Sequence, residues 1–308
     1  MPSRLDRTIQ RTMARRKPAT VHGMLVVDKP AGMTSHDVVG LLRRRLGERR
    51  IGHAGTLDPD ATGVLVVGVG NATRLMRYAT AGEKTYQCEV VLGSETSTLD
   101  SSGEVTARHH MVLEPDEVRE ASKAFLGEIQ QVPPMVSAVR VGGRRLHELA
   151  REGVEVERAP RHITVSSFDL QPTSDPLVYR AVITCSAGTY VRTLGADLGS
   201  ALGGGAHIRA LRRTASGSFG EDQAAAPDEA RLRPVVDMVG SMTRMLVSVS
   251  DHPTIRNGGV LPFDRYQGEG PWAVVAAHPD TGGSDELLAV HELVGDRIRV
   301  GVVIPLPS

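Results

Sequence analysis

The chain has 308 residues, 40% of them hydrophobic, and its 36 lysines and arginines are balanced by 36 acidic residues. This length favours one large domain with a small one beside it, and the neutral charge argues against a protein that coats nucleic acid. The two cysteines, Cys88 and Cys185, lie in apolar runs without other ligands at metal-binding spacing. They argue against a disulfide framework and a zinc site, and they favour a reducing compartment.

Membrane and cofactor signals are missing from the sequence. No run approaches the ~20 apolar residues that span a bilayer, and no apolar signal-peptide core is present at the N-terminus. Gly68 and Gly70 lack the rest of a dinucleotide fingerprint, and His147-Glu148 is followed by Arg151 where a zinc-protease helix has its second histidine. We therefore expect a cytoplasmic protein without membrane association, metal or cofactor.

The cations are almost all arginine and occur in clusters. These comprise Arg43–Arg45 with Arg49 and Arg50, the pair Arg144 and Arg145, and Arg209 with Arg212 and Arg213. Arginine suits bidentate contact with phosphate and stacking on bases, so a neutral chain can still present a basic face to RNA. Genome base composition is a second source of arginine, but it does not explain the clustering.

Residues 1–22 contain six lysines and arginines and one acid, which predicts a flexible basic arm. An organelle transit peptide would have a similar composition. From Gly23 the pattern changes and predicts a strand at Met24–Asp28, a turn, and a helix from about His36 to Leu46 capped by Thr34 or Ser35.

Asp58 and Asp60 lie in a segment of glycines, threonines and a proline, directly before the buried strand predicted at Val64–Val67. An Asp-Pro pair between glycines by itself predicts only a turn. The longer pattern Gly-His-x-Gly-x-Leu-Asp-Pro-x-Ala-x-Gly-Val-Leu at residues 52–65 resembles the catalytic segment of the TruB family of pseudouridine synthases. In that family the aspartate carries the chemistry, so the resemblance implies that Asp58 is catalytic.

Two further segments resemble family motifs. The run Leu-x-x-x-Lys-Pro-x-Gly-x-Thr-Ser at residues 25–35 is similar to the N-terminal motif, which supports the active-site loop. The run Lys-Thr-Tyr at 84–86 opens a predicted strand that ends near Gly93, and it matches the motif whose tyrosine stacks on the target base. The resemblance thus implicates Lys29 and Tyr86.

The middle of the chain predicts a helix at 114–126, a proline-stiffened segment with a short strand and turn at 130–143, and a helix at 144–151. The run Pro-Pro-x-x-Ser-Ala-x-x-x-x-Gly at 133–143 also resembles the family. Val136 and His147 stand where the family commonly has tyrosines, which argues against an aromatic RNA contact there.

A third chemical segment follows. A buried strand is predicted at Val182–Ser186, then a turn, then a helix that opens at Tyr190. The Gly-Thr-Tyr-x-Arg-Thr pattern at 188–193 is a family signal that pairs Arg192 with the catalytic carboxylate. The run Gly-Ala-x-x-x-x-Leu-Arg-Arg at 205–213 matches another motif, which implies that Leu211 faces the target base and that the arginines face phosphates.

Residues 221–242 are polar, with helical patches, and are predicted to end a large domain at 23–243. From about Leu246 the chain changes to short strands, predicted at 259–262, 272–276, 286–291 and 297–304. They predict a small β domain at 246–308 whose position resembles that of the family's PUA-type RNA-binding domain.

The resemblance as a whole implies an α+β chain: a mixed α/β pseudouridine synthase domain with a central, mainly antiparallel sheet, and a small C-terminal β domain. The implied activity is isomerisation of uridine 55 in the T-loop of tRNA, with base flipping and no cofactor. The resemblance also implies assistance to tRNA folding. The implied partner is the T-arm of tRNA, and we expect a monomer without a protein partner. The catalytic residues implied are Asp58, Tyr86 and Arg192, and the RNA or substrate contacts are His53, Tyr190, Leu211, Lys29, Arg209 and Arg212.

The sequence leaves the step performed by Asp58 open, since it could attack C1′ or C6 of the nucleotide or take a proton from C2′. Three other functions are alternatives. A non-catalytic RNA-binding or RNA-folding protein could use the same scaffold. A glycosidic hydrolase normally needs two carboxylates flanking the bond, and Asp60 need not face the ligand that Asp58 faces. A guide-RNA-dependent relative would dock on partner proteins, for which no site is identified.

Overall fold

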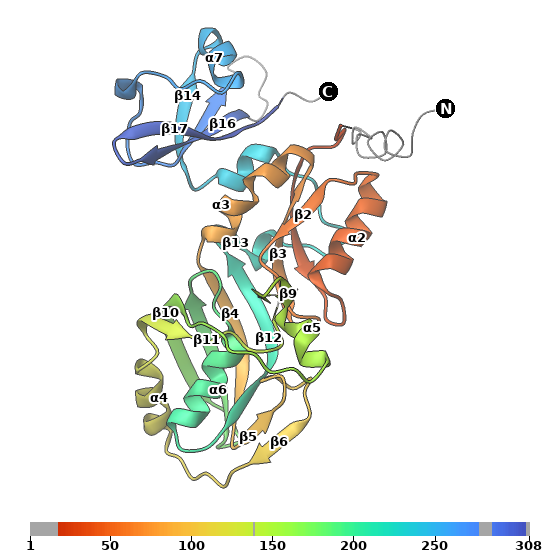
Figure 1. Ribbon diagram of the computed structural model, residues 1–308, viewed down its shortest axis with the longest axis vertical. Coiled ribbons are helices and arrows are strands. Elements are labelled where there is room, and N and C mark those ends of the chain that lie inside the picture. Colours follow the sequence, from red (N-terminus) through yellow and green to blue (C-terminus); the bar gives the residue numbers. More distant parts are fainter. Residues whose placement is uncertain (1–17, 138, 277–284, 306–308) are drawn as a thin grey trace.

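The computed structural model describes residues 18–137, 139–276 and 285–305 (Figure 1). Residues 1–17 of the expected basic arm lie outside the described residues. The helices are α2 (Ser35–Leu46), α3 (Met76–Ala81), α4 (Pro115–Lys123), α5 (Leu146–Arg151), α6 (Val191–Ala201) and α7 (His252–Arg256), with short 3₁₀ helices η1 (Gly70–Leu75), η2 (Glu221–Gln223), η3 (Val235–Val239), η4 (Val249–Asp251) and η5 (Phe263–Arg265). Within these ranges, no helix is long and apolar enough to cross a membrane.

Nine strands form the main sheet: β1 (Gly23–Lys29), β2 (Ile51–Ala54), β3 (Thr62–Val69), β4 (Lys84–Leu92), β7 (Gly127–Gln131), β10 (Arg161–Pro172), β11 (Val178–Cys185), β12 (Ala206–Ser216) and β13 (Phe219–Gly220). Their order is β1-β3-β12-β4-β11-β10-β7, with β2 beside β3 and β13 beside β12. All pairings are antiparallel except that of β12 with β3, which holds only Arg212 opposite Thr62 and Arg213 opposite Gly63. The predicted mainly antiparallel sheet is confirmed.

This short parallel pairing joins two half-sheets, and the predicted catalytic loop leads into it. Gly63 has φ +101°, and a Cβ at this position would lie 2.2 Å from the carbonyl oxygen of Arg213. Only glycine therefore allows β12 to approach β3 so closely. The junction fixes the C-terminal end of the loop that carries Asp58.

In the first half-sheet, β1 and β3 are buried on both faces. Met24 and Val26 pack on one side, together with η1 and η3, while Leu25 and Val27 pack on the other side against α2. Such double burial explains why these strands read as continuous apolar runs rather than alternating ones.

Helix α2 lies against this half-sheet and is capped at both ends. The hydroxyl of Thr34 accepts a hydrogen bond from Asp37 N at 3.0 Å, the Asp37 carboxylate accepts one from Thr34 N at 2.9 Å, and Gly47 ends the helix with φ +64°. The predicted cap and the helix at 36–46 are confirmed. A capping box of this kind fixes where the helix begins, next to the loop that carries Asp58.

The second half-sheet packs α4 and α6 on a separate core. Strand β11 buries Ala181, Ile183 and Cys185 in that core, but Val182 is 37% exposed. The expectation of a strand buried throughout was therefore wrong, because this half-sheet has one solvated face.

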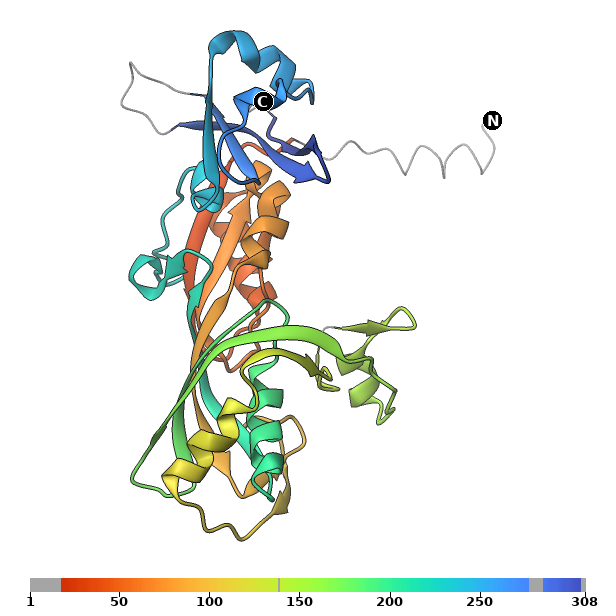
Figure 2. The ribbon, with the colours of Figure 1, turned by 90° about the vertical axis from the view of Figure 1, so that its left-hand side faces the viewer.

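A second sheet of four strands has the order β14 (Thr243–Val247), β15 (Trp272–Ala276), β16 (Glu286–Val294) and β17 (Arg297–Val303). It forms one end of the elongated molecule, while α5 and the hairpin of β8 (Arg140–Val141) and β9 (Arg144–Arg145) project from the body (Figure 2). The hairpin of β5 (Ser94–Thr96) and β6 (Val105–Arg108) lies at the opposite end (Figure 1).

The strand predicted at 259–262 is absent: this segment follows α7 without forming a strand, and Gly258, with φ +82°, ends the helix rather than making a hairpin turn. Strand β14 was missed and begins at Thr243. Ala273 and Val275 of this second sheet pack in the same core as Met24 and Val26 of the main sheet. The two sheets are thus joined by shared apolar packing.

Candidate active site

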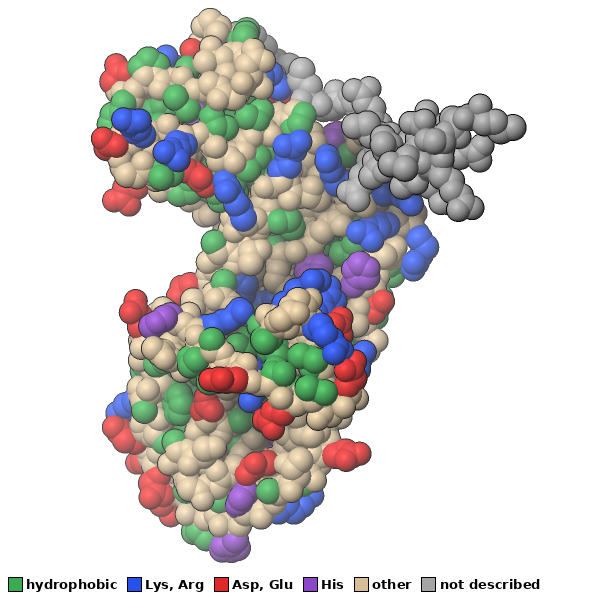
Figure 3. Space-filling model, viewed as in Figure 1, with side chains coloured by type: hydrophobic (Ala, Val, Ile, Leu, Met, Phe, Trp, Pro, Cys, Tyr) green, Lys and Arg blue, Asp and Glu red, His purple; other side chains and the backbone are tan. Residues whose placement is uncertain are grey.

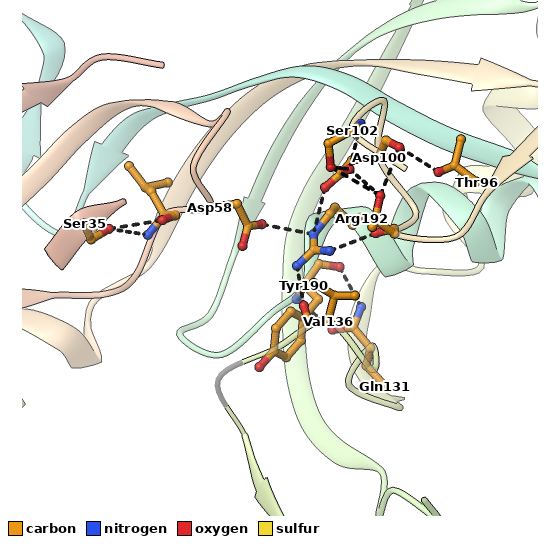
Figure 4. Close-up of polar contacts among 11 residues, drawn as sticks. Ser35, Asp58, Thr96, Asp100, Ser102, Gln131, Val136, Tyr190 and Arg192 are labelled. Carbon is orange, nitrogen blue, oxygen red and sulfur yellow. Dashed lines mark hydrogen bonds and ion pairs between the residues drawn. The ribbon is translucent and has the colours of Figure 1, made fainter. Parts of the chain in front are cut away.

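The loop between β2 and β3, residues 55–61, carries Asp58 and is held by side chains from outside it. Ser35, the first residue of α2, makes two hydrogen bonds to Leu57: its hydroxyl donates to Leu57 O at 3.1 Å and accepts from Leu57 N at 2.9 Å. The loop therefore stands in a fixed relation to the capped end of α2 (Figure 4).

Lys29 supports the same loop from beneath. Its side chain is fully buried, and its ammonium donates to the carbonyl oxygens of Pro30, Met33 and Pro59 at 2.8, 2.5 and 2.9 Å. Burial lowers the pKa of Lys29, and Asp60 and Asp58 oppose that shift. The ammonium of Lys29 is enclosed in this structure, where it braces the loop that carries Asp58.

We expect Lys29→Met to lower the free energy of unfolding by about 2 to 3 kcal/mol, because three buried carbonyl oxygens would lose their donor. Chemical denaturation of the purified protein measures this change. Lys123→Met is the matched control, since Lys123 is exposed and pairs only with Glu120 on the surface of α4. Equal unfolding midpoints for the two variants would contradict the bracing role.

Arg213 holds both ends of the loop. Its guanidinium is fully buried and donates from Nε to Val64 O at 2.7 Å and from Nη2 to Gly55 O at 3.1 Å. In this structure the guanidinium faces these two carbonyls. The carbonyl of the first loop residue and one that follows the loop share a single rigid planar donor, which fixes the spacing of the two loop ends.

Asp58 meets Arg192, which comes from the first turn of α6. Nε of Arg192 lies 3.0 Å from Oδ2 of Asp58 and 3.6 Å from Oδ2 of Asp100. The Arg192 side chain is only 4% exposed, whereas 41% of the Asp58 side chain remains accessible. One carboxylate is thus fixed by a buried cation and still open to a ligand (Figure 4).

The remaining nitrogens of Arg192 are used by the backbone. Nη1 donates to Thr98 O and Nη2 donates to Val136 O, each at 2.8 Å. Asp100 is itself held by its own loop, because its Oδ1 accepts hydrogen bonds from the Thr98 hydroxyl at 2.6 Å and from Ser102 N at 3.0 Å. The guanidinium is therefore held beside Asp58 by two backbone carbonyls and a second carboxylate.

Burial raises the pKa of Asp58 above its ordinary value, and the charge of Arg192 opposes that effect without cancelling it. The negative charge of Asp100 acts in the same direction as burial. Asp58 consequently holds a proton more tightly than a solvated aspartate does.

Asp58, Arg192 and Leu211 line two adjoining cavities. One, of about 310 Å³, also contains Asp100 and Arg209; the other, of about 270 Å³, also contains Tyr86, Tyr190, Lys84 and Arg213. Pockets that hold small ligands begin at about 300 Å³. The first cavity reaches this size and the second falls just below it, and Asp58 lines both.

A bulge in β12 places Leu211 between the two cavities. The register of β12 against β4 shifts between Arg209 and Arg212, and Ala210 has φ +52°, which is uncommon for a residue other than glycine. Bulges of this kind redirect side chains next to functional sites. The strained backbone here accompanies the exposure of Leu211 to both cavities.

The two tyrosines reach the second cavity from different elements. Tyr86 comes from β4, is 7% exposed, and has a pKa raised by burial. Tyr190 precedes α6, and its backbone is held by Gln131, whose amide oxygen accepts from Tyr190 N at 2.8 Å and whose amide nitrogen donates to Tyr190 O at 3.1 Å. No sequence motif marks Gln131, because its partner is 59 residues away.

The other expected RNA contacts are dispersed. His53 lies in β2 rather than in the loop and is not among the residues lining either cavity. Arg209 lines the first cavity but pairs with Glu89 at 2.7 Å. Arg212 donates both terminal nitrogens to Asp28 at 3.0 and 2.9 Å and its Nε to Glu221. The guanidinium of Arg212 is thus paired with two carboxylates in this structure.

Sequence reasoning also missed Asp100 and Lys84 as members of the site. Burial lowers the pKa of Lys84 to about 8, and its ammonium donates to the carbonyl oxygens of Thr80 and Gly82. Across the described ranges, no group of three or more His, Cys, Asp or Glu side chains is arranged to hold a metal ion.

Comparison with known proteins gives consistent matches. The model of the TruB family pseudouridylate synthase N-terminal domain matches residues 43–191, and that of the tRNA pseudouridylate synthase B C-terminal domain matches residues 192–233. A relative named tRNA pseudouridine synthase B from Symbiobacterium thermophilum is 50% identical, over 74% of this chain and 79% of its own. The tRNA pseudouridine synthase B of Moorella thermoacetica is 43% identical, over 89% of this chain and 99% of its own.

Among solved structures, a chain of a Cbf5-Nop10-Gar1 complex is similar with a TM-score of 0.69 and 24% identity, covering 92% of this chain and 85% of that one. A chain of an archaeal box H/ACA Nop10-Cbf5 complex is similar with a TM-score of 0.66 and 22% identity, covering 93% and 87%. At this identity the likeness shows the fold alone.

Proposed function

Because the chain belongs to the TruB family of pseudouridylate synthases, we propose that it isomerises uridine to pseudouridine in tRNA, at position 55 of the T-loop, and that Asp58 carries the chemistry. The observation that supports this most strongly is the Asp58 carboxylate itself. It is 41% exposed, sits on a loop braced from several sides, and pairs at 3.0 Å with a buried arginine.

The reaction needs no oxidant or reductant. The bond from N1 to C1′ breaks, the base rotates, and C1′ bonds to C5; the C5 proton leaves to solvent and N1 takes up a proton. Asp58 acts as nucleophile at C1′ or C6, or as base at C2′, and each of these roles requires the ionised carboxylate. Arg192 supplies the charge that keeps part of Asp58 ionised despite its burial.

A uridine in a folded loop must leave the base stack before Asp58 can reach it. Tyr86, Tyr190 and Leu211 line the cavity beside Asp58 and present the apolar and aromatic surface that an extruded base needs. We assign Tyr86 to stacking on the base and the other two to the walls of the base pocket. His53 is assigned to the space that the base leaves in the RNA.

Asp100→Asn is expected to shift the acid limb of the rate profile to lower pH. The negative charge of Asp100 raises the pKa of Asp58, and asparagine would remove that charge while its oxygen keeps the hydrogen bonds from Thr98 and Ser102. Since the rate falls as pH drops through the pKa of an essential carboxylate, lowering this pKa extends activity into acid. Single-turnover rates between about pH 4 and pH 8 measure the shift. A shift toward higher pH would contradict this electrostatic account.

The position of modification is tested with an unmodified tRNA transcript and a matched transcript that carries cytidine at position 55. Carbodiimide labelling followed by reverse transcription locates pseudouridine in each. We expect one stop, assigned to position 55, in the first transcript and none in the second. Modification of another uridine in both transcripts would retain the activity and overturn the position.

We also propose that residues 23–243 form the catalytic domain and residues 246–308 a PUA-like domain that extends contact with tRNA. The separate four-stranded sheet and its shared packing with the main sheet support this arrangement. We further propose that the protein acts as a monomer in the cytoplasm, on the T-arm of tRNA, and that binding there also assists tRNA folding.

A further inference from the structure

The arginines that the sequence pointed to as phosphate contacts are mostly occupied within the protein. Arg213 is buried against two carbonyls, Arg212 binds two carboxylates, and Arg209 binds Glu89. An RNA phosphate would have to displace these partners before it could bind any of the three arginines. Arginines without a partner in the described part of the protein lie elsewhere on the surface.

One cluster of free cations lies at the C-terminal end of α2, and we call Arg44, Arg49 and Arg50 the α2 basic patch. All three side chains are exposed, and none of their guanidinium groups forms a hydrogen bond or ion pair with the described part of the chain. Figure 3 shows Lys and Arg side chains gathered over this end of α2. Arg74, in the neighbouring η1, is exposed as well.

The acid next to this patch does not neutralise it by direct pairing. Glu48 is 6% exposed, and its carboxylate accepts hydrogen bonds from the backbone nitrogens of Arg50 at 2.8 Å and Thr20 at 3.0 Å. The carboxylate thus faces inward, while the guanidinium groups face solvent. The bond to Thr20 also brings the chain segment that follows the basic residues 1–17 beside the patch.

The composition around the patch suits phosphates rather than bases. Helix α2, residues 47–50, β2 and η1 contain no phenylalanine, tyrosine or tryptophan. Sequence-specific binding of single-stranded RNA relies on aromatic side chains that stack on bases, whereas a helical stem is recognised largely through its phosphates and sugars. Exposed arginines without aromatics therefore fit a double-stranded stem.

Helix α2 also connects the patch to the active site. Ser35 at its first position binds Leu57 next to Asp58, and Arg44 lies nine residues further along the helix, about 14 Å away. Arg49 and Arg50 follow the end of the helix. An RNA whose target loop occupies the cavities at Asp58 would extend its adjoining stem over a distance of this size.

We propose that the α2 basic patch binds the phosphate backbone of the double-stranded stem that adjoins the target loop. This inference rests on the proposed function for the identity of the RNA. The patch acts as a second, non-catalytic contact that holds the stem while the loop is opened at Asp58.

The test compares the triple variant Arg44→Gln/Arg49→Gln/Arg50→Gln with a control of equal charge change, Arg108→Gln/Arg119→Gln/Arg180→Gln. The control arginines lie on the β5–β6 hairpin, on α4 and on β11, in the part of the molecule away from α2 (Figure 1). Dissociation constants are measured between about 50 and 200 mM salt for an unmodified tRNA transcript and for a single-stranded oligonucleotide with the loop sequence.

For the patch variant we expect the dissociation constant for tRNA to rise about tenfold. We also expect the slope of log K against log salt to become shallower by about 2 to 3, because each of the three arginines would lose one phosphate contact. Binding of the single strand should change no more than in the control variant. Equal tRNA affinity and slope in patch and control variants would overturn the proposal. Equal losses for tRNA and single strand would overturn the assignment to a stem.

These binding measurements do not depend on turnover, so the two claims fail separately. If the wild-type protein forms no pseudouridine, and only the patch variant loses tRNA affinity and salt dependence, the proposed binding surface is supported and the proposed activity is contradicted. If the wild type forms pseudouridine and the patch variant binds tRNA like the control variant, the proposed activity is supported and the proposed binding surface is contradicted.

Discussion

Replacing Asp58 by asparagine is expected to abolish isomerisation, with a loss of at least about 10⁴-fold in the single-turnover rate. Asparagine keeps the shape of the side chain but can neither act as the nucleophile nor accept the proton. Arg192 would retain Asp100 and its two backbone acceptors, so the buried guanidinium would not be left without partners. We therefore expect the fold to persist and tRNA affinity to stay within a few fold of wild type.

Asp60→Asn is the matched control for this variant, because Asp60 lies on the same loop two residues further along and makes no ion pair with the described residues. Rates and tRNA affinities of both variants are measured on the same transcript. If the reaction used a pair of carboxylates, as hydrolysis of glycosidic bonds does, both substitutions would be severe. Retained activity in Asp58→Asn, or a parallel loss of binding, would contradict the role of Asp58.

Arg192→Ala is expected to reduce both stability and activity. The change removes a buried cation that pairs with two carboxylates and donates to two carbonyl oxygens. Because these partners are left unpaired, we expect the free energy of unfolding to fall by about 3 to 5 kcal/mol. It also raises the pKa of Asp58, because the attraction that favours the ionised form is lost while burial and Asp100 remain. At a fixed pH less Asp58 is ionised, and we expect a rate loss of about 10²-fold or more.

Two measurements separate these effects. Chemical denaturation gives the loss of stability, and single-turnover rates across pH show whether the acid limb has moved to higher pH, as a raised pKa requires. Arg192→Lys keeps the positive charge but not the planar donor geometry, so it should recover part of the pH shift and little of the stability. Normal turnover in Arg192→Ala would refute the pairing.

The local elements could largely be read from the sequence, because each has a local cause. Strands β1 and β3 are continuous apolar runs, and α2 has a capping box and a terminal glycine. The failure at residues 259–262 has a local cause too. Asn-Gly is a hairpin signal between two strands, but here it follows the short helix α7 and ends it.

The candidate site could be predicted only as a set of motifs, because its geometry depends on distant partners. Lys29 and Arg212 looked like RNA contacts; the fold encloses the first among carbonyls and places the second between Asp28 and Glu221. Asp100 and Gln131 carried no signal, since an acid in a turn and a polar residue in a strand are ordinary locally. Their partners, Arg192 and Tyr190, are distant in the sequence: Gln131 comes near Tyr190 because β7 pairs with β10 and β10 pairs with β11.

The most direct test of the central claim is release of tritium from unmodified tRNA that carries uridine labelled at C5. Formation of the C1′–C5 bond expels the C5 hydrogen, so isomerisation and release are coupled. We predict that the wild-type protein, without added nucleotide or metal, releases one equivalent per tRNA, and that Asp58→Asn releases none. No release by a wild-type protein that binds the tRNA tightly would contradict the account and indicate an RNA-binding protein on the same scaffold.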